Sequence, residues 1–354
     1  MSRGARLGPP AAAAAPLDAL RRPLRDLRIS VTDRCNFRCP YCMPAEIYGE
    51  SYPFLQKPEL LSFEEILRLA RLFVEQGVEK IRITGGEPLL RHQLPHLIEK
   101  LAGLPGLRDL TLTTNGFLLA KQAKTLRDAG LQRVTVSLDA LDPAIFERMS
   151  GRSTGPERVL EGIDAAEAVG LAPIKLNCVV QRGVNEGEIP VLAARFRGTP
   201  HVLRFIEFMD VGTLNGWELS QVVPADEILE RVSQLCPLTP VPPSYPGEVA
   251  SRFRYTDGSG EIGVIASVTK PFCGACTRAR LTIEGKLVTC LFSETGTDLR
   301  GPLRAGESDA LLAARIAGVW RARRDRYSEE RAGLTDSTGH TPPRPRIEMY
   351  QVGG

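Results

Sequence analysis

The chain has 354 residues, of which 43% are hydrophobic and 25% are charged, and this composition excludes a disordered or collagen-like protein. Its 45 basic and 42 acidic side chains nearly balance, which argues against a general polyanion binder. Any anion must therefore be bound at a local site. The length fits two domains, or one α/β barrel of about 250 residues with an appendage. No apolar run reaches the roughly 18 residues that a membrane-spanning helix needs.

The first residues combine a short alanine run with prolines. Residues 11–15 are too short and too weakly apolar for the core of a signal peptide, and Pro9, Pro10 and Pro16 interrupt the pattern. We interpret residues 1–16 as a flexible tail of a reducing, cytoplasmic protein. In that compartment clustered cysteines are more often metal ligands than disulfides.

Short β-type runs then alternate with amphipathic helical patterns. The predicted strands are 27–32, 80–84, 110–114, 134–138, 174–180 and 202–208. The first predicted helix begins at a capping box of Ser62 and Glu65 and ends at Gly77. Further helices are predicted near 91–102, 119–129, 156–169 and 186–197. Six βα units in series predict a parallel sheet, either open and doubly wound or an incompletely closed barrel.

Several residues follow directly on the ends of predicted strands. They are Cys35, Gly85 to Pro88, Asn115 and Asp139. Ligands of parallel sheets bind at the carboxyl ends of the strands. We therefore expect these residues to converge at one mouth.

The pattern changes after residue 237. Prolines between 237 and 246 indicate a linker, and turns at 257–260 and 284–285 predict β-hairpins. A basic helix is predicted around 309–327, before a proline-rich tail that ends in Gly353 and Gly354. We divide the chain into a flexible tail (1–20), a partial (βα)6 barrel (21–240) and a C-terminal α+β domain (241–354).

Six of the eight cysteines form two sets. The first is Cys35-x3-Cys39-x2-Cys42, which places three thiolates on one short loop. A structural zinc site normally has four protein ligands, whereas three thiolates suit a four-iron cluster with one iron open to an exogenous ligand. Zinc remains an alternative if Cys178 or Cys236 supplies a fourth ligand, although both lie in apolar surroundings typical of small core residues.

The second set is Cys273-x2-Cys276-x13-Cys290, again three cysteines without a close fourth. Arg278 and Arg280 follow at once, and a zinc ribbon with solvated arginines is the alternative. Two other arginines, Arg82 and Arg204, lie inside apolar strands, where an unpaired charge would be costly.

The first set, with Tyr41 before its last cysteine and Gly85-Gly-Glu-Pro88 after the next strand, resembles the radical S-adenosylmethionine superfamily. In that superfamily the amino and carboxylate groups of the methionine moiety chelate the open iron. Gly85 and Gly86 would let the backbone approach this ligand closely, and Glu87 or backbone carbonyls would meet its ammonium.

With the second set, the chain resembles the GTP 3′,8-cyclase family of molybdenum cofactor biosynthesis over roughly residues 20–354. The motifs that carry this resemblance are residues 32–39, 82–88, 113–116, 136–139, 204–210 and the terminal Gly353-Gly354. The resemblance implies two [4Fe-4S] clusters, held by Cys35, Cys39 and Cys42 and by Cys273, Cys276 and Cys290. The second cluster would contact the guanine of the substrate through its own open iron.

The resemblance also implies roles for other side chains. S-adenosylmethionine would be contacted by Tyr41, Gly86, Ser137 and Met209. GTP would be bound by Arg28, Lys80, Arg82, Thr113, Lys175, Arg204, Arg278, Ala279 and Arg280, and arginine forks suit a triphosphate through bidentate, charge-assisted hydrogen bonds. Gly353 and Gly354 would reach the active site as a catalytic tail.

The implied reaction begins when a one-electron reductant cleaves S-adenosylmethionine to a 5′-deoxyadenosyl radical, which takes the 3′ hydrogen of GTP. The 3′ carbon then attacks C8, and after uptake of one electron and one proton the product would be 3′,8-cyclo-7,8-dihydro-GTP, which a cyclic pyranopterin monophosphate synthase would consume. We expect a monomer or homodimer with no nucleic acid or membrane partner.

Two alternatives remain. Another twin-cluster radical enzyme, such as a peptide or sulfatase maturase, should carry more auxiliary cysteines. A zinc-stabilised nucleic-acid-binding protein would show strongly salt-dependent binding and have no use for residues 85–88.

Overall fold

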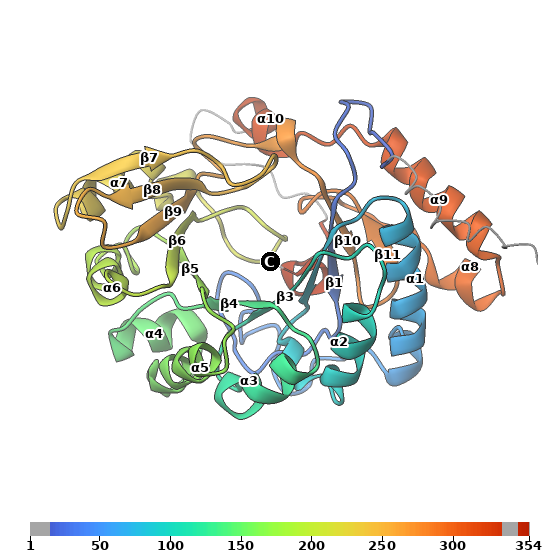
Figure 1. Ribbon diagram of the computed structural model, residues 1–354. Helices are drawn as coiled ribbons and strands as arrows, with labels where there is room; N and C mark the ends of the chain where they lie inside the picture. Colours follow the sequence, from blue (N-terminus) through green and yellow to red (C-terminus); the bar gives the residue numbers. More distant parts are fainter. Residues whose placement is uncertain (1–14, 335–345, 354) are drawn as a thin grey trace, which may run out of the picture.

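The structure is a computed structural model that describes residues 15–334 and 346–353. One strongly curved sheet forms an incomplete ring, and helices cover its outer face (Figure 1). The sheet has twelve strands in the order β12-β11-β10-β1-β2-β3-β4-β5-β6-β9-β8-β7. The two end strands of this order do not pair with each other, so the predicted incomplete barrel is confirmed.

Six parallel strands form the centre of the sheet, each beside the next in the chain. They are β1 (Asp26–Ser30), β2 (Lys80–Thr84), β3 (Asp109–Thr114), β4 (Arg133–Ser137), β5 (Lys175–Val180) and β6 (Val202–Glu207). All six were predicted. In β2, Ile81 and Ile83 belong to the apolar core under the helices, while Lys80 and Arg82 line the interior. This alternation is the period of two expected of a strand with unlike faces.

The outer helices are α1 (Phe63–Glu75), α2 (Leu94–Ala102), α3 (Leu119–Asp128), α4 (Pro143–Ser150), α5 (Glu157–Ala168), α6 (Glu188–Phe196) and α7 (Ala225–Ser233). The predicted capping box of α1 is confirmed, because the Ser62 side chain accepts from the amide of Glu65 and the Glu65 side chain accepts from the amide of Ser62. The sequence analysis missed α4 and α7. The start of α4 was visible in the sequence, since Asp142 caps it and Pro143 occupies its first position.

The C-terminal strands extend both edges of the partial barrel. On one side β9 (Glu261–Ile265) pairs in parallel with β6, followed by β8 (Ser251–Tyr255) and β7 (Leu238–Val241). On the other side β10 (Arg278–Leu281) pairs in parallel with β1, followed by β11 (Lys286–Val288) and β12 (Thr297–Asp298). Both predicted hairpin turns are present, between β8 and β9 and between β10 and β11.

The predicted linker was partly wrong. Residues 238–241 form β7, and Pro240 is tolerated there because β7 is an edge strand. The boundary that we placed after residue 240 falls inside this strand.

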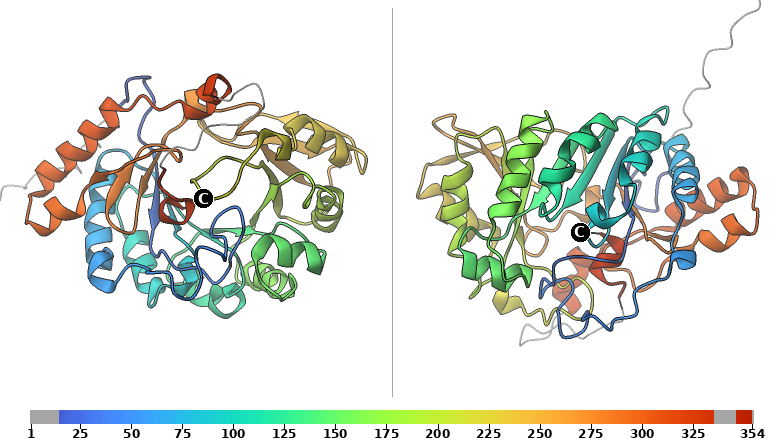
Figure 2. Two further views of the ribbon diagram at one scale, coloured as in Figure 1. Left: turned by 180° about the vertical axis from the view of Figure 1, so that it is seen from behind. Right: turned by 90° about the horizontal axis from the view of Figure 1, so that it is seen from below.

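The remaining helices are α8 (Arg300–Arg304), α9 (Asp309–Ala322), α10 (Tyr327–Leu334) and α11 (Met349–Val352). The helix predicted at 309–327 ends earlier because Arg323 is extended. The short α11 lies inside the curve of the sheet, so the C-terminus is at its centre (Figures 1 and 2). In the described part of the chain, no helix is long and apolar enough to span a bilayer.

The predicted N-terminal tail was too long. Asp18 is buried and accepts from Arg22 at 2.6 Å and from Arg323 at 3.4 Å. The folded region therefore includes residues that we assigned to the tail, whose residues 1–14 lie outside the described part.

Glu207 ties the C-terminal extension to β6. Its side chain is fully buried and accepts from the amides of Ala225, Val268 and Thr269 at 2.7–2.9 Å, and from the Thr269 hydroxyl. One carboxylate thus holds the start of α7 and the loop after β9 against the end of β6.

We predict that Glu207→Gln lowers the free energy of unfolding by about 1–3 kcal/mol, because the amide nitrogen would face donors that need an acceptor. Urea unfolding of the apoprotein measures the effect. Glu227→Gln is the matched control, since Glu227 forms only partly exposed ion pairs with Arg182 and Arg231 and should change stability by about 1 kcal/mol or less. Equal midpoints for both variants would contradict the prediction.

Candidate active site

A large cavity fills the interior of the curved sheet. Its empty volume is about 2110 Å³, including the part that is open to solvent. Cys35, Gly86, Asn115 and Asp139 all line it, which confirms that the residues after the strand ends converge.

Most of the predicted site residues lie on the wall of this cavity. They are Arg28, Cys35, Cys39, Tyr41, Cys42, Lys80, Arg82, Gly86, Thr113, Ser137, Arg204, Met209, Cys273, Cys276, Arg278, Arg280 and Cys290. The two cysteine sets come from opposite ends of the chain. They share one cavity because β10 pairs with β1.

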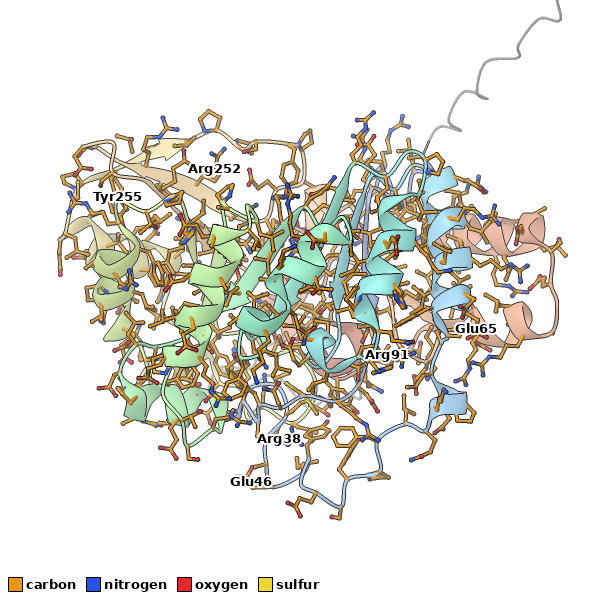
Figure 3. All side chains as sticks on the ribbon, turned by 60° about the horizontal axis from the view of Figure 1, so that its bottom comes forward. Arg38, Glu46, Glu65, Arg91, Arg252 and Tyr255 are labelled. Carbon is orange, nitrogen blue, oxygen red and sulfur yellow. The ribbon has the colours of Figure 1, made fainter. Side chains whose placement is uncertain are left out.

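The first cysteine set lies on the loop after β1. Arg38 holds this loop by donating to the carbonyls of Cys35, Phe37 and Tyr48 at 2.6–2.8 Å. Figure 3 shows Arg38 near Glu46 at one end of the molecule, opposite Arg252 and Tyr255 of β8. Burial, reinforced by Glu87, raises the pKa of the Cys35 thiol to about 12. A metal that binds here must therefore displace protons from the thiols.

Gly85 and Gly86 pack directly against the start of this loop. A Cβ on Gly85 would lie 2.6 Å from the Thr32 carbonyl oxygen, and one on Gly86 would collide with the Arg34 carbonyl. The Gly86 amide donates to Thr32 and the Glu87 amide to Arg34, both at 2.8 Å. The glycines are therefore required by the chain's own backbone, whereas we had explained them by close approach of a ligand.

The Glu87 carboxylate lies on the cavity wall and joins two strands. It accepts from the amide of Leu89, the hydroxyl of Thr114 and the amide of Asn115 at 2.7–3.0 Å. Burial raises its pKa to about 7 despite these donors. The carboxylate thus connects the end of β2 with the end of β3.

Tyr41 faces the end of β4. Its hydroxyl donates to Asp139 at 2.7 Å, and Asp139 also accepts from the amide of Val179. Burial raises the pKa of Asp139 to about 6. Ser137 and Met209 line the same part of the chain's interior from the ends of β4 and β6.

The second cysteine set begins in a 3-10 turn at Cys273–Ala275. Arg323 donates to the carbonyl and to the sulfur of Cys276, at 2.8 and 3.1 Å, and Arg22 donates to the carbonyl of Cys273. Burial alone would raise the pKa of Cys276, but Arg278 and Arg323 outweigh it and lower the pKa to about 6. An arginine thus holds each cysteine loop.

Among the described residues, no three His, Cys, Asp or Glu side chains are placed to hold one metal ion. A four-iron cluster needs no such convergence, because its cysteine ligands bind different irons. Two sets of three thiols on the wall of a large cavity fit that group.

A basic wall faces the cysteines. Arg280, Arg28 and Arg82 are direct neighbours across β10, β1 and β2. Arg82 donates to the hydroxyls of Thr113 and Thr135, and Arg204 donates to the amide oxygen of Asn177.

These partners of the arginines are neutral. Within the described part of the chain, Nε of Arg28 and Nε of Arg204 are buried without a hydrogen-bond partner. Burial and the neighbouring guanidiniums lower the pKa of Arg28 well below its usual value. Burying a cation without a counter-charge costs free energy, and a bound anion would offset this cost. This wall therefore suits an anionic ligand.

Two lysines accompany the arginines. Lys80 lies 3.7 Å from both Asp26 and Asp109. Lys175 is not among the residues that line the cavity, and burial together with the Arg204 guanidinium lowers its pKa to about 7.

Two further predicted residues are placed differently. Ala279 is fully buried in the apolar core behind β10, so it contributes only backbone to the site. Gly353 lies in the barrel, where Arg280 donates to its carbonyl and to that of Val352. Gly354 lies outside the described residues.

The sequence analysis did not identify the residues that hold the cysteine loops and the arginine side chains in place. Arg38 is inside one of the quoted motifs, so its position was a usable signal. Thr135, Asn177 and Arg323 carry no local signal, since only the fold brings them to the site.

Comparisons with known proteins agree with this geometry. The family model "Radical SAM superfamily" matches residues 29–196, and "Molybdenum Cofactor Synthesis C" matches residues 201–329. A GTP 3′,8-cyclase of Acidothermus cellulolyticus is 56% identical over 95% of this chain and 94% of its own. The chain belongs to the GTP 3′,8-cyclase family. A GTP 3′,8-cyclase of Xanthomonas campestris is 51% identical over 98% of this chain and 99% of its own.

Solved structures share the fold of this GTP 3′,8-cyclase family member. Streptococcus suis SuiB has a TM-score of 0.60 at 15% identity, over 89% of this chain and 69% of its own. A crystal structure of SuiB bound to S-adenosylmethionine matches with a TM-score of 0.59.

We predict that Arg38→Met reduces bound iron from about eight to about four per chain, because the first cysteine loop loses three backbone contacts. Iron and sulfide analysis of anaerobically purified protein measures this. Arg34→Met is the control, since Arg34 is exposed on the same loop and contacts Phe54 through its guanidinium. Full iron content in the Arg38 variant would show that the loop does not need this residue.

Proposed function

We propose that the protein is a GTP 3′,8-cyclase that converts GTP to 3′,8-cyclo-7,8-dihydro-GTP, the first step of molybdenum cofactor biosynthesis. One observation supports this most directly. A single cavity has two sets of three cysteines on its wall, and buried arginines without anionic partners line the same cavity. That combination suits two clusters and a triphosphate.

Cys35, Cys39 and Cys42 would hold one cluster, and Cys273, Cys276 and Cys290 the other. When bound, the first cluster supplies the one-electron reduction that cleaves S-adenosylmethionine. Tyr41, Gly86, Ser137 and Met209 would contact that cosubstrate.

The chain's own residues bind and orient GTP. Arg28, Arg82, Arg204, Arg278 and Arg280 lie around one volume, so a triphosphate there would meet guanidinium groups on several sides. The β-strands and α11 would enclose the bound nucleotide on the sides that they form. Gly353 and Gly354 would complete this enclosure.

The wider setting is also part of the proposal. We infer a cytoplasmic enzyme that receives electrons from a one-electron reductant and passes its product to a cyclic pyranopterin monophosphate synthase. It would act as a monomer or homodimer.

The test is anaerobic incubation with GTP, S-adenosylmethionine and dithionite, followed by mass spectrometry of the nucleotide. We expect cyclised nucleotide, and 5′-deoxyadenosine that depends on GTP. Arg278→Ala and Arg280→Ala should each lower kcat/KM by roughly tenfold to hundredfold. Arg254→Ala, which removes a 55% exposed side chain on β8, should not. Equal 5′-deoxyadenosine with and without GTP, and no cyclised product, would disprove the substrate assignment.

Lys175 makes GTP binding dependent on pH. Its pKa of about 7 in the free protein leaves it largely neutral at pH 8. A nearby triphosphate favours the charged form, so we predict uptake of up to about one proton per GTP at pH 8. GTP affinity should therefore fall as the pH rises above 7.

Calorimetry in buffers of different ionisation enthalpy measures this uptake. Lys175→Met should abolish it, while Lys124→Met should not, because Lys124 is 79% exposed on α3. Unchanged uptake in the Lys175 variant would assign the proton to another group.

A further inference from the structure

Asp210 follows β6 and Met209, and its role is not explained by binding of substrate or cofactor. The residue is 5% exposed and does not line the cavity. Nevertheless its carboxylate and its carbonyl are contacted from two later parts of the chain. A buried carboxylate in this position needs a structural or functional reason.

Three side chains converge on Asp210. Arg331 Nε of α10 donates to Oδ1 at 2.9 Å, and the Tyr327 hydroxyl donates to Oδ2. Arg346 Nη1 donates to the Asp210 carbonyl and to Oδ2, the latter at 3.1 Å. The side chains of Arg331 and Arg346 are 4% and 5% exposed, so the pairs are desolvated.

The two guanidiniums would repel each other without this carboxylate. Both also stack on the ring of Phe292, at 5.3 and 5.6 Å from its centroid. Phe292 lies two residues after Cys290 and lines the cavity. The cluster of Asp210, Tyr327, Arg331 and Arg346 therefore connects the end of β6 with the loop of the second cysteine set.

Arg346 is the first described residue of the segment 346–353, whose helix α11 lies inside the curve of the sheet. After it, Glu348 accepts from the amide and hydroxyl of Thr213, and the hydroxyls of Tyr350 and Tyr52 lie 3.0 Å apart. The segment ends where Arg280 binds the carbonyls of Val352 and Gly353. The ion pair with Asp210 thus holds the Arg346 end of this segment, and breaking a buried pair is strongly unfavourable.

We propose that Asp210 is a positioning residue that docks the C-terminal segment 346–353 inside the barrel, through Arg346. Asp210 fixes Arg346 at one end of the segment. This contact helps to place the carbonyls of Val352 and Gly353 at Arg280. The docking of the segment does not depend on which substrate the enzyme uses. The expected effect of docking on the rate of GTP cyclisation does rest on the proposed function.

Trypsin digestion of the anaerobic holoenzyme measures the docking. Cleavage after Arg346 requires its buried side chain to leave Asp210, and it releases residues 347–354, which mass spectrometry detects. We expect Asp210→Asn to release this fragment about tenfold faster or more, because it leaves the Arg346 guanidinium buried without its counter-charge. For the Met variant, which trypsin does not cut at 346, hydrogen exchange at the amides of Gln351 and Gly353 replaces the digest.

Matched variants separate docking from general stability. Arg346→Lys keeps the charge and should retain slow exchange, whereas Arg346→Met should not. Asp226→Asn removes an exposed carboxylate that pairs with Lys270 on the surface, and it should behave as wild type. The double variant of Asp210→Asn and Arg346→Met should exchange no faster than Asp210→Asn alone, because the carboxylate that pairs with Arg346 is already absent in Asp210→Asn.

Fast exchange in Asp210→Asn and Arg346→Met, with full iron content and a lower kcat for GTP cyclisation, supports the proposal. A segment as protected in Asp210→Asn as in wild type overturns it. If Asp210→Asn does not fold, equal exchange in Arg346→Lys and Arg346→Met overturns it instead. Absence of cyclisation by the wild type would refute the proposed function, while the exchange measurements would still decide the role of Asp210.

Discussion

The uncompensated positive charge inside the barrel is the constraint on which the rest of the structure depends. Arg280, Arg28 and Arg82 are neighbours on adjacent strands, and their hydrogen-bond partners from the chain are largely neutral. In a packed barrel these positions would hold branched apolar side chains. Here the apolar core lies between the sheet and its outer helices, so the interior is free to hold charge, and a bound polyanion would relieve the repulsion.

The C-terminal strands build the site as much as the barrel does. Because β10 pairs with β1, Arg278 and Arg280 join the arginines of the barrel, and the second cysteine set meets the first across one cavity. Each cysteine loop is held by arginines that donate to its carbonyls. These arginines fix the loop backbone and place positive charge near the thiols, which suits ligands that bind as thiolates.

Two acidic residues of the motif 204–210 have different roles because they contact different parts of the chain. Glu207 satisfies backbone donors at α7 and after β9, and so fixes the extension of the sheet. Asp210 instead pairs with guanidiniums from α10 and from the C-terminal segment. The residues at and after the end of β6 therefore hold two parts of the chain. Glu207 holds α7 and the loop after β9, and Asp210 holds the segment 346–353.

The sequence by itself determined the six central strands, the capping box of α1 and the two cysteine sets, because strand alternation, capping and ligand spacing are local. It also indicated that Arg82 and Arg204 are buried, since their strands are apolar. Only the tertiary structure decided why Gly85 and Gly86 are needed, that Glu87 joins two strands, and that residues 238–241 form an edge strand. Those outcomes depend on contacts between residues far apart in the chain, such as β10 with β1 and Arg346 with Asp210, which no local pattern encodes.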